Sequence, residues 1–435
     1  MKITIVGSGY VGLVSGICFA KLGHEVFCVD KDQNKISQLE SGDIPIFEPN
    51  LKDLLREALK NKKISFYSSL KEPLQNCEAV FIAVGTPQGE DGSADLSYVL
   101  EVAKEVAETS DSYKLIITKS TVPAGTGAKI KNLIAKINPS LDFSVASNPE
   151  FLREGMAISD FMEPDRIVVG FEDVKSEKLL EEIYQKFPAN KLVKTDIITA
   201  ELIKYASNSF LATKIAFINE MSDLCEIVGG DIKKLSFAMG ADSRIGNKFL
   251  NPGPGFGGSC FPKDIMAILN IGQENNVDLS LIRSVVSSNK NRKTKMIKKI
   301  SDVFQGDLAN KKIAVLGLAF KANTDDIRYS PAISIVKELL KNGAKVCAHD
   351  FEAINNSKKE LKDFDNIEFF QDYYDAIKDC DAVVIATEWE EYKQLNFARI
   401  KEITKSRKII DLRNLFEIKE VEHLGFNYFY VGKKS

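Results

Sequence analysis

The sequence predicts an α/β protein with two Rossmann-like, doubly wound domains joined by a long central helix and further helices. Residues 2–30 show the order strand, glycine turn, helix, strand, which is typical of a nucleotide-binding unit. Residues 311–350 repeat that order. Between them, an apolar pattern of helical period starts at Thr199 and meets no proline or glycine before Gly229. We therefore expect two parallel sheets and one long helix that links them.

The first glycine turn has the dinucleotide fingerprint in its expected context. Gly7 permits the tight turn after the strand, Gly9 lets a pyrophosphate approach the backbone, and Gly12 allows the helix to pack closely. The phosphates would rest on the amides at the start of the helix. Asp30, at the end of the second strand, would accept hydrogen bonds from ribose hydroxyls and favours NAD, while the basic Lys31 beside it leaves NADP as the alternative.

Further strands are expected at residues 79–84, 115–118 and 143–146, each followed by polar or turn residues. In an open parallel sheet, ligands lie outside the carboxyl ends of the strands, so these loops are candidate binding loops. Thr86 and Thr121 lie in two of them, but local turn or cap hydrogen bonds explain both residues equally well.

Within the long helix, Lys204 and Asn208 are four residues apart and share one face. Small residues surround them, as expected where a helix passes close to a ligand, yet a solvated polar stripe explains the pair equally well. A second helical run is expected over residues 279–304. Its basic face, residues 290–299, is expected to be solvated and not to bind nucleic acid, because no aromatic residues interleave it.

One cysteine lies between a glycine-rich turn and an expected helix start, in the segment 255–264. Pro262 suits a first helical position, so Cys260 should lie at or just before a helix N-terminus. The helix dipole and Lys263 would both favour the thiolate, and the preceding glycines would leave backbone amides uncovered for a substrate. A buried, inert cysteine is the alternative.

The second glycine turn keeps only Gly317 of the fingerprint, and Phe320 and Lys321 fill the turn. A doubly wound domain with a filled phosphate turn is expected to bind a nucleotide other than a second NAD. Later strands are expected at residues 382–387, at residues 408–412 and after Glu417.

Composition excludes several classes of function. Lysine plus arginine number 58 against 61 acidic residues, so no net field attracts nucleic acid or an anionic membrane. No run is long and apolar enough to span a membrane, and residues 1–7 read as a strand and not as a signal peptide, so we expect a cytoplasmic protein. The seven cysteines are scattered without metal-ligand pairs, and we expect no metal.

Four segments together resemble the nucleotide-sugar dehydrogenases: residues 147–155, 200–204, 255–264 and 317–321. Their order and spacing are those of the family, and the likeness runs from residue 2 to 430 or so. The resemblance implies an NAD-binding Rossmann domain over residues 1–198, a central helical dimerisation domain with the catalytic cysteine over residues 199–305, and a UDP-sugar-binding Rossmann-like domain over residues 306–435.

The family oxidises a sugar C6 alcohol twice, passing hydride to two NAD molecules in turn. The resemblance implies UDP-glucose as the substrate and UDP-glucuronate as the product. An aldehyde has no alkoxide from which to expel hydride, whereas its thiolate adduct does, which gives a cysteine a role. By resemblance, Cys260 is the nucleophile and passes through a thiohemiacetal and a thioester.

The resemblance assigns the other catalytic roles as well. Asp264 handles protons together with water, and Lys204 and Asn208 stabilise negative charge on the C6 oxygen. Glu150 is the base for thioester hydrolysis, and Thr121 helps to position water.

The same resemblance implies contacts with both ligands. The cofactor contacts fall on Gly7, Gly9, Tyr10, Val11, Gly12, Asp30, Lys35, Thr86, Thr121, Glu154, Lys263 and Arg328. The substrate contacts fall on Glu150, Phe151, Leu152, Arg153, Glu154, Lys204, Asn208, Arg244, Phe249, Leu250, Asn251, Pro252, Gly253, Gly257, Lys321 and Arg413. Arg244 is expected to reach the site of a neighbouring subunit, so we expect at least a homodimer.

Three alternatives stay open. Relatives that act on GDP-mannose or an N-acetylated UDP-hexosamine share the cysteine, lysine and asparagine, while Arg244 and the loop 251–253 favour UDP-glucose. If the protein were instead a non-catalytic NAD-binding sensor, the presence of Lys204, Asn208, Cys260 and Asp264 together would be a coincidence. A two-electron hydroxyacid dehydrogenase would leave Cys260 without a role. One residue departs from the family pattern, Asn50, where glycine is usual.

Overall fold

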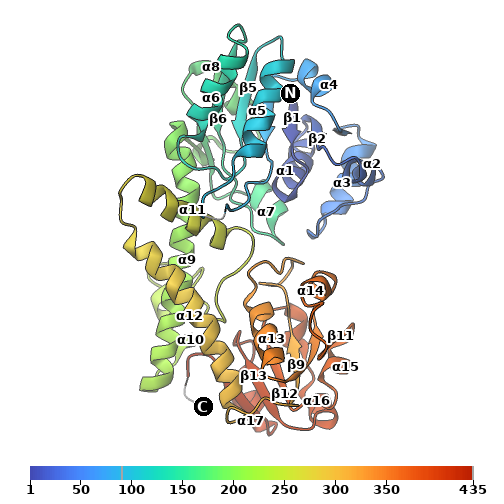
Figure 1. Cartoon of the computed structure of the whole chain (residues 1–435), viewed down its shortest axis with the longest axis vertical. Coiled ribbons are helices and arrows are strands. Elements are labelled where there is room, and N and C mark those ends of the chain that lie inside the picture. Colours follow the sequence, from blue (N-terminus) through green and yellow to red (C-terminus); the bar gives the residue numbers. More distant parts are fainter. Residues whose placement is uncertain (90–91, 434–435) are drawn as a thin grey trace. The chain divides into compact units, whose positions relative to one another are not determined.

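The computed structural model describes residues 1–89 and 92–433 (Figure 1). The chain forms two compact units. Unit 1 comprises Met1–Ser207 and Met266–Asp278, and unit 2 comprises Asn208–Ile265 and Leu279–Ser435. The division falls inside two helices, α9 (Ile197–Val228) and α11 (Phe261–Glu274), so each unit contains one part of both helices.

Unit 1 is built on an eight-stranded sheet in the order β3-β2-β1-β4-β5-β6-β7-β8. Neighbouring strands are parallel except β6 and β7, which meet through Ser147 and Gly170 in antiparallel fashion. The strands are β1 (Lys2–Val6), β2 (Glu25–Val29), β3 (Ile64–Tyr67), β4 (Ala79–Ile82), β5 (Lys114–Thr118), β6 (Phe143–Ser147), β7 (Ile167–Gly170) and β8 (Leu192–Thr195). The expected strands at β1, β2, β4, β5 and β6 are therefore confirmed.

Continuous apolar runs produce the central strands of unit 1, because helices cover a parallel sheet on both faces. Strands β4 and β5 are buried at every residue. The helices are α1 (Tyr10–Lys21), α2 (Gln33–Glu40), α3 (Leu51–Lys60), α4 (Lys71–Asn76), α5 (Ser97–Thr109), α6 (Thr126–Ile137), α7 (Ala157–Met162) and α8 (Val174–Ile183). Phe19 of α1 packs on Phe81 of β4 and Phe161 of α7, with ring centroids 5.2 and 5.0 Å apart.

Asn50 precedes α3 with a φ of 64°, in the left-handed region. Asparagine is one of the few residues besides glycine that visit this region routinely. The departure from the family's usual glycine therefore leaves the turn in a conformation that glycine would also adopt.

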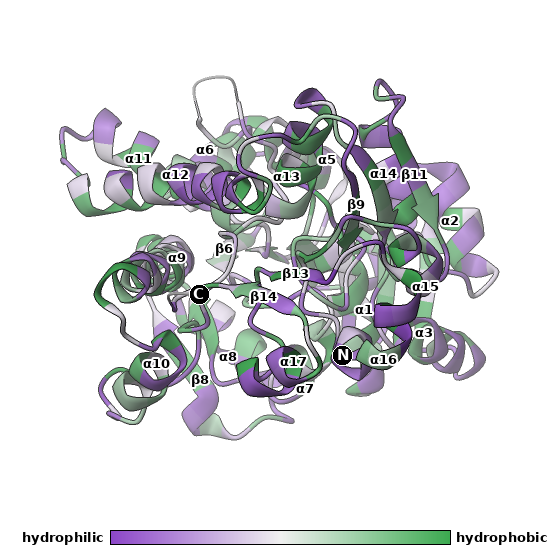
Figure 2. Cartoon of the chain, turned by 90° about the horizontal axis from the view of Figure 1, so that it is seen from below, coloured by the Kyte–Doolittle hydropathy of each residue, from purple (hydrophilic) through white to green (hydrophobic). Residues whose placement is uncertain are grey.

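Unit 2 contains a six-stranded sheet in the order β11-β10-β9-β12-β13-β14, parallel throughout. Its strands are β9 (Lys312–Leu316), β10 (Lys345–His349), β11 (Ile367–Phe370), β12 (Ala382–Ile385), β13 (Lys408–Asp411) and β14 (Asn427–Tyr430). Its remaining helices are α10 (Ile232–Gly240), α12 (Ser280–Asp302), α13 (Pro331–Lys341), α14 (Ile354–Glu360), α15 (Tyr373–Ile377), α16 (Phe397–Ile403) and α17 (Ile418–His423). Apolar residues concentrate in the inner strands, as β9 shows (Figure 2).

The tail of the chain differs from the expectation of a strand directly after Glu417. The short helix α17 comes first, and the closing strand β14 begins only at Asn427. The strand still completes the sheet, because it pairs in parallel with β13.

The glycine turn of unit 2 is filled by the protein itself. Gly317 has a φ of 95°, and a Cβ added to it would lie 2.3 Å from the side chain of Thr387. Asp350, at the end of β10, holds the place that Asp30 holds in unit 1, but it is only 1% exposed. Its carboxylate accepts hydrogen bonds from the amides of Leu318, Ala319, Glu352 and Ala353 and from the indole of Trp389. Those oxygens already serve the fold, which supports the expectation that this turn holds no second NAD.

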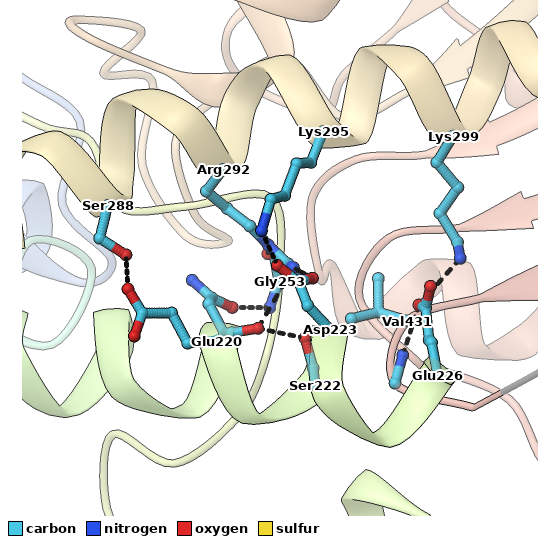
Figure 3. A network of polar contacts seen from close by, with 12 residues as sticks. Glu220, Ser222, Asp223, Glu226, Gly253, Ser288, Arg292, Lys295, Lys299 and Val431 are labelled. Atoms are coloured by element: carbon cyan, nitrogen blue, oxygen red, sulfur yellow. Dashed lines mark hydrogen bonds and ion pairs between the residues drawn. The ribbon is translucent and has the colours of Figure 1, made fainter. Parts of the chain in front are cut away.

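Charged residues join α9 to α12 within unit 2 (Figure 3). Glu220 accepts a hydrogen bond from Ser288, Asp223 pairs with both Arg292 and Lys295, and Glu226 pairs with Lys299. The basic face of α12 was expected to be solvated, and Lys295 is indeed half exposed. Arg292, however, is only 3% exposed, so this face is in part an internal contact between two helices.

None of the helices formed by residues 1–89 and 92–433 combines the length and apolarity that crossing a membrane requires.

Candidate active site

The turn between β1 and α1 is shaped to receive an anion. Gly7 has a φ of 101°, and an added Cβ would lie 2.7 Å from the carbonyl oxygen of Ala83. A Cβ on Gly12 would lie 1.8 Å from the carbonyl oxygen of Gly7. By contrast, a Cβ on Gly9 would meet no heavy atom within 4 Å, and no side chain caps the first turn of α1. The helix amides therefore face open space, as binding of a pyrophosphate requires.

Asp30 lies at the end of β2, beside this turn. Its carboxylate accepts hydrogen bonds from the amides of Ser8 (2.9 Å) and Asp32 (3.1 Å) and from Nζ of Lys35 (2.8 Å). Burial alone would raise the pKa of Asp30, but these donors outweigh it and lower the pKa. The ionised carboxylate is suited to accept hydrogen bonds from ribose hydroxyls. Lys31 instead lies over the ring of Tyr98, with Nζ 4.7 Å from the centroid.

Tyr10, at the start of α1, is tied to a buried carboxylate. Its hydroxyl donates to Glu48, which also accepts hydrogen bonds from the amides of Gly155 (2.6 Å) and Ala157 (2.8 Å). Burial and the Glu48 hydrogen bond raise the pKa of Tyr10 far above its usual value. Glu48 thus links the cofactor turn to the loop that carries Glu154. Val11, beside Tyr10, is partly exposed at the helix start.

The loops after β4 and β5 meet. The hydroxyl of Thr86 donates to the carbonyl oxygen of Thr121, 2.9 Å away. The second loop ends at α6, where Glu201 of α9 accepts hydrogen bonds from the amides of Gly125 (2.6 Å) and Gly127 (2.8 Å). Burial raises the pKa of Glu201 to about 7, although the amide donors oppose the shift.

Glu150 and Lys204 form a buried ion pair in unit 1. Lys204 Nζ lies 2.8 Å from Glu150 Oε1, and each side chain is 4% exposed. Burial alone would raise the pKa of Glu150, but the charge and hydrogen bond of Lys204 and the Leu152 amide lower it. Lys119 lies behind this pair, fully buried, and burial lowers its pKa to about 8. The ion pair therefore keeps Glu150 ionised.

The loop that follows Glu150 carries four of the predicted substrate contacts, Phe151 to Glu154. The Arg166 guanidinium lies 3.9 Å from the Phe151 ring centroid. The Arg153 guanidinium pairs with Asp160 at 2.5 Å. Leu152 is partly buried and packs against the hydrophobic core.

Asn208 and Asp264 meet in unit 2. Asn208 Nδ2 donates to Asp264 Oδ2 at 2.6 Å, and both side chains are buried. Lys263 pairs with the other oxygen of Asp264 at 2.7 Å. Cys260 immediately precedes α11, and its carbonyl oxygen accepts the first helical hydrogen bond, from the Asp264 amide (2.9 Å). The expected position of the cysteine at a helix N-terminus is confirmed.

The glycines before Cys260 do not leave the backbone open, so that expectation was wrong. A Cβ on Gly257 would lie 2.6 Å from the carbonyl oxygen of Tyr329, and one on Gly258 would lie 2.7 Å from the ring of Phe320. The glycines are needed because other parts of unit 2 pack closely against them.

A cavity of about 660 Å³ lies in unit 2. It is lined by Lys233, Ser236, Phe237, Asn247, Asn251, Pro252, Glu388, Lys393, Arg413, Asn414 and Leu415. Arg413 is held there by hydrogen bonds to the carbonyl oxygens of Ala386 and Phe320, both 2.9 Å, and by Glu388 at 3.0 Å. The cavity combines basic, amide and aromatic groups, which suits a nucleotide diphosphate.

The remaining predicted substrate and cofactor residues lie elsewhere in unit 2. Leu250 is buried and Phe249 lies beside Phe261, with ring centroids 6.2 Å apart. Lys321 lies over the Phe320 ring at 5.5 Å. Arg328 pairs with Asp326 (2.8 Å), and Arg244, 87% exposed, pairs with Asp242 (2.6 Å). Within the described residues, these side chains do not line the cavity.

Three sequence profiles of one family match the chain in order. Its NAD binding domain matches residues 1–188, its central domain residues 198–291 and its UDP binding domain residues 314–418. The chain belongs to the UDP-glucose/GDP-mannose dehydrogenase family. The resemblance seen in the sequence, the two Rossmann-like domains and the choice of NAD as cofactor are therefore confirmed.

Members of this family match along the whole chain. The chain is similar to a UDP-glucose 6-dehydrogenase of Rickettsia conorii, with 50% identity and 100% coverage of both chains. A UDP-glucose 6-dehydrogenase of Rhizobium meliloti is 47% identical with the same coverage. The solved structure of a UDP-glucose dehydrogenase from Pyrobaculum islandicum matches with a TM-score of 0.92 and 35% identity, covering 100% of this chain and 98% of the other.

Sequence reasoning missed several residues that shape this dehydrogenase site. Glu48 and Glu201 bind backbone amides of the cofactor and substrate loops, and Lys119 lies buried behind Glu150. Charged residues are rarely buried without a partner, but a partner distant in the chain leaves no local signal. Glu201 lies within the segment 200–204, three residues before Lys204 and on the same helix face.

Two glycine variants separate the fold of the cofactor turn from its binding role. Gly12→Ala forces a methyl group onto the Gly7 carbonyl, so we expect a loss of stability of about 1–3 kcal/mol together with loss of NAD binding. Gly9→Ala meets no atom, so its stability should change by less than about 0.5 kcal/mol. NAD affinity should still fall, because the methyl group occupies the open space. Calorimetry and NADH fluorescence measure the two effects, and equal destabilisation by both variants would contradict this account.

The Glu150–Lys204 pair makes stability depend on pH. Because the folded pKa of Glu150 is lowered, the pair stabilises the protein above about pH 4.5, and this contribution is lost as pH falls through the lowered pKa. Lys204→Met leaves a buried unpaired carboxylate, so we expect a loss of about 3–5 kcal/mol at pH 7. Calorimetry at pH 7 should show recovery in the double variant Lys204→Met/Glu150→Gln. A double variant as unstable as the single one would refute the pairing.

Proposed function

We propose that the chain oxidises UDP-glucose at C6 to UDP-glucuronate, with two NAD molecules reduced per sugar. One observation carries the proposal: α9 presents Lys204, paired with Glu150, and one turn later Asn208, paired with an aspartate four residues after Cys260. This is the donor, base and thiol set that a four-electron oxidation needs. Whole-chain similarity to UDP-glucose 6-dehydrogenases supports the choice of sugar.

The first oxidation turns the C6 alcohol into an aldehyde. The hydroxyl proton leaves to water held by Asp264, and C6 loses a hydride. NAD, held by the β1–α1 turn and Asp30, supplies the hydride acceptor in both oxidations. Lys204 and Asn208 donate N–H groups to the C6 oxygen and stabilise its negative charge.

The second oxidation proceeds through the cysteine. The Cys260 thiolate adds to the aldehyde carbon, so a C–S bond forms and the oxygen becomes an alkoxide again. Loss of the second hydride leaves a thioester. Glu150 takes a proton from water, the hydroxide adds to the carbonyl, and the C–S bond breaks to release thiolate and a carboxylic acid, which loses its proton to solvent. Each sugar thus consumes one water and two NAD.

The UDP moiety is assigned to the cavity of unit 2. Arg413, Lys233 and Lys393 provide positive charge for the diphosphate, and Asn251 provides an amide. The match of residues 314–418 to the family's UDP binding domain supports this assignment.

We further propose that the protein is a homodimer through α9. Phe210, Phe217 and Leu224 recur every seven residues and are 66%, 44% and 50% exposed, so they form one apolar stripe on the helix. Phe237 of α10 adds a ring that is 80% exposed. Exposed apolar surface of this kind is typical of a subunit interface. A second copy would also bring its exposed Arg244.

A cytoplasmic location is proposed from the cysteine chemistry. All seven cysteines lie in the described residues and none forms a disulfide, as in proteins of a reducing compartment.

The stoichiometry of NADH tests the proposed reaction. UDP-glucose and NAD should yield two NADH per sugar with the wild-type protein, and the acid should be the product. Cys260→Ala should retain NAD binding and lose acid formation. A ratio of one NADH, ending at the aldehyde, would refute the thioester route, while a preference for GDP-mannose or an N-acetylated UDP-hexosamine in a substrate panel would refute UDP-glucose.

Subunit complementation tests the dimer and the role of Arg244. Arg244→Ala and Cys260→Ala should each be inactive, but mixing them under exchange should restore up to about a quarter of wild-type activity, because half the dimers are mixed and each then holds one intact site. No recovery would place Arg244 in its own subunit's site. Phe217→Glu should give monomers in sedimentation, whereas Leu281→Glu, on α12, should not.

A further inference from the structure

A seven-residue stretch of backbone before Cys260 is buried without forming a helix or strand. Residues 252–258, called the buried segment below, are all buried. Backbone amides and carbonyls that are removed from water need hydrogen-bond partners. In a helix or sheet, neighbouring backbone supplies them, so here the partners must come from elsewhere in the protein.

Two side chains hold the start of the buried segment at Gly253 (Figure 3). Asn219 of α9 accepts a hydrogen bond from the Gly253 amide at 2.8 Å. Arg292 of α12 donates from Nε to the Gly253 carbonyl oxygen, also at 2.8 Å. Arg292 also contacts α9 directly, because its Nη1 donates to the backbone oxygen of Asn219 at 3.3 Å.

Asn289 holds the middle of the buried segment, one turn before Arg292 on α12. Its Oδ1 accepts from the Phe256 amide (2.9 Å) and its Nδ2 donates to the Phe256 carbonyl oxygen (3.0 Å). The carboxamide therefore satisfies both backbone groups of one residue, as a neighbouring strand would. Gly255 makes room for it, since an added Cβ would lie 2.8 Å from Asn289 Oδ1.

The held residues are connected to the cysteine and to the cavity. Phe256 packs edge-on against Phe261, the residue after Cys260, with ring centroids 6.1 Å apart. Gly253 lies against Arg413, so that a Cβ there would be 3.2 Å from Nη1. A displacement of the buried segment would therefore move groups next to both the thiol and the substrate cavity.

Arg292 itself is fixed by charge. It is 3% exposed, and Asp223 of α9, which also pairs with Lys295 at 2.5 Å, neutralises it. The guanidinium cannot swing into solvent without leaving that partner, so its Nε remains directed at Gly253.

We propose that Asn219, Asn289 and Arg292 are positioning residues that set the place of the Cys260 thiol and of the cavity wall through the buried segment. The inference rests on the proposed function for its effect on turnover. Misplacement of a reacting group by about 1 Å lowers turnover by about 100-fold. These three side chains oppose such a displacement, together with the backbone hydrogen bond from the Gly258 amide to the Arg328 carbonyl oxygen (2.8 Å) at the end of the segment.

The test uses two mild variants and a matched control in the full-length protein. Arg292→Lys keeps a cation for Asp223 but cannot donate from Nε to Gly253. Asn289→Asp keeps the acceptor for the Phe256 amide and loses the donor. Lys295→Met removes the other partner of Asp223, on the same helix, without touching the buried segment.

Hydrogen exchange and kinetics are the two readouts. Arg292→Lys and Asn289→Asp should exchange faster than wild type in a peptide covering residues 250–260 and should lower kcat for UDP-glucose at least about tenfold with NAD affinity unchanged. Lys295→Met should match wild type within about twofold. Unchanged exchange in both variants, or faster exchange with full kcat, would overturn the proposal, as would equal losses in the control. If wild type itself makes no NADH from UDP-glucose, the proposed reaction fails, while the exchange data still decide whether the side chains hold the segment.

Discussion

The unbroken run of α9 is the constraint on which the candidate site depends. A helix advances about 1.5 Å per residue with 3.6 residues per turn, so Glu201, Lys204 and Asn208 must share one face. Each is buried and each meets a different partner, respectively the start of α6, Glu150 and Asp264. A proline between them would kink or break the helix and so disturb this register. The same regularity places the exposed ring of Phe210 and its heptad successors on another face.

Local patterns in the sequence predicted most of the fold. The strand, glycine turn and helix at residues 2–21 depend on backbone sterics and hydrophobic period, which act between near neighbours. The helix start after Cys260 is of the same kind, because Pro262 suits a first turn. The expectation of two parallel sheets followed once two such units were recognised, but not the order of their strands. Spacing alone could not decide whether Lys204 and Asn208 belong to a site or to a solvated helix face. The resemblance of whole motifs to a known family was needed to predict their roles.

The long-range polar contacts could not be predicted from the sequence. Arg292 stands in a run that reads as a solvated basic face, and only the approach of Asp223 and Gly253 makes its burial tolerable. Glycines such as Gly258 suggested an open backbone, whereas the ring of Phe320, far along the chain, occupies the space. In each case the sequence does not show which distant segment packs against the residue, because that depends on the tertiary structure.

The two aspartates that follow β2 and β10 occupy equivalent positions in the two Rossmann-like domains but have different partners. Asp30 accepts hydrogen bonds from two amides and from Lys35 beside an open turn, while the oxygens of Asp350 accept from four amides and an indole inside the domain. The two carboxylates therefore have different physical roles. Replacing Asp30 would chiefly alter what the first domain can bind, whereas replacing Asp350 would leave buried amides of the second domain without an acceptor and so weaken its folding.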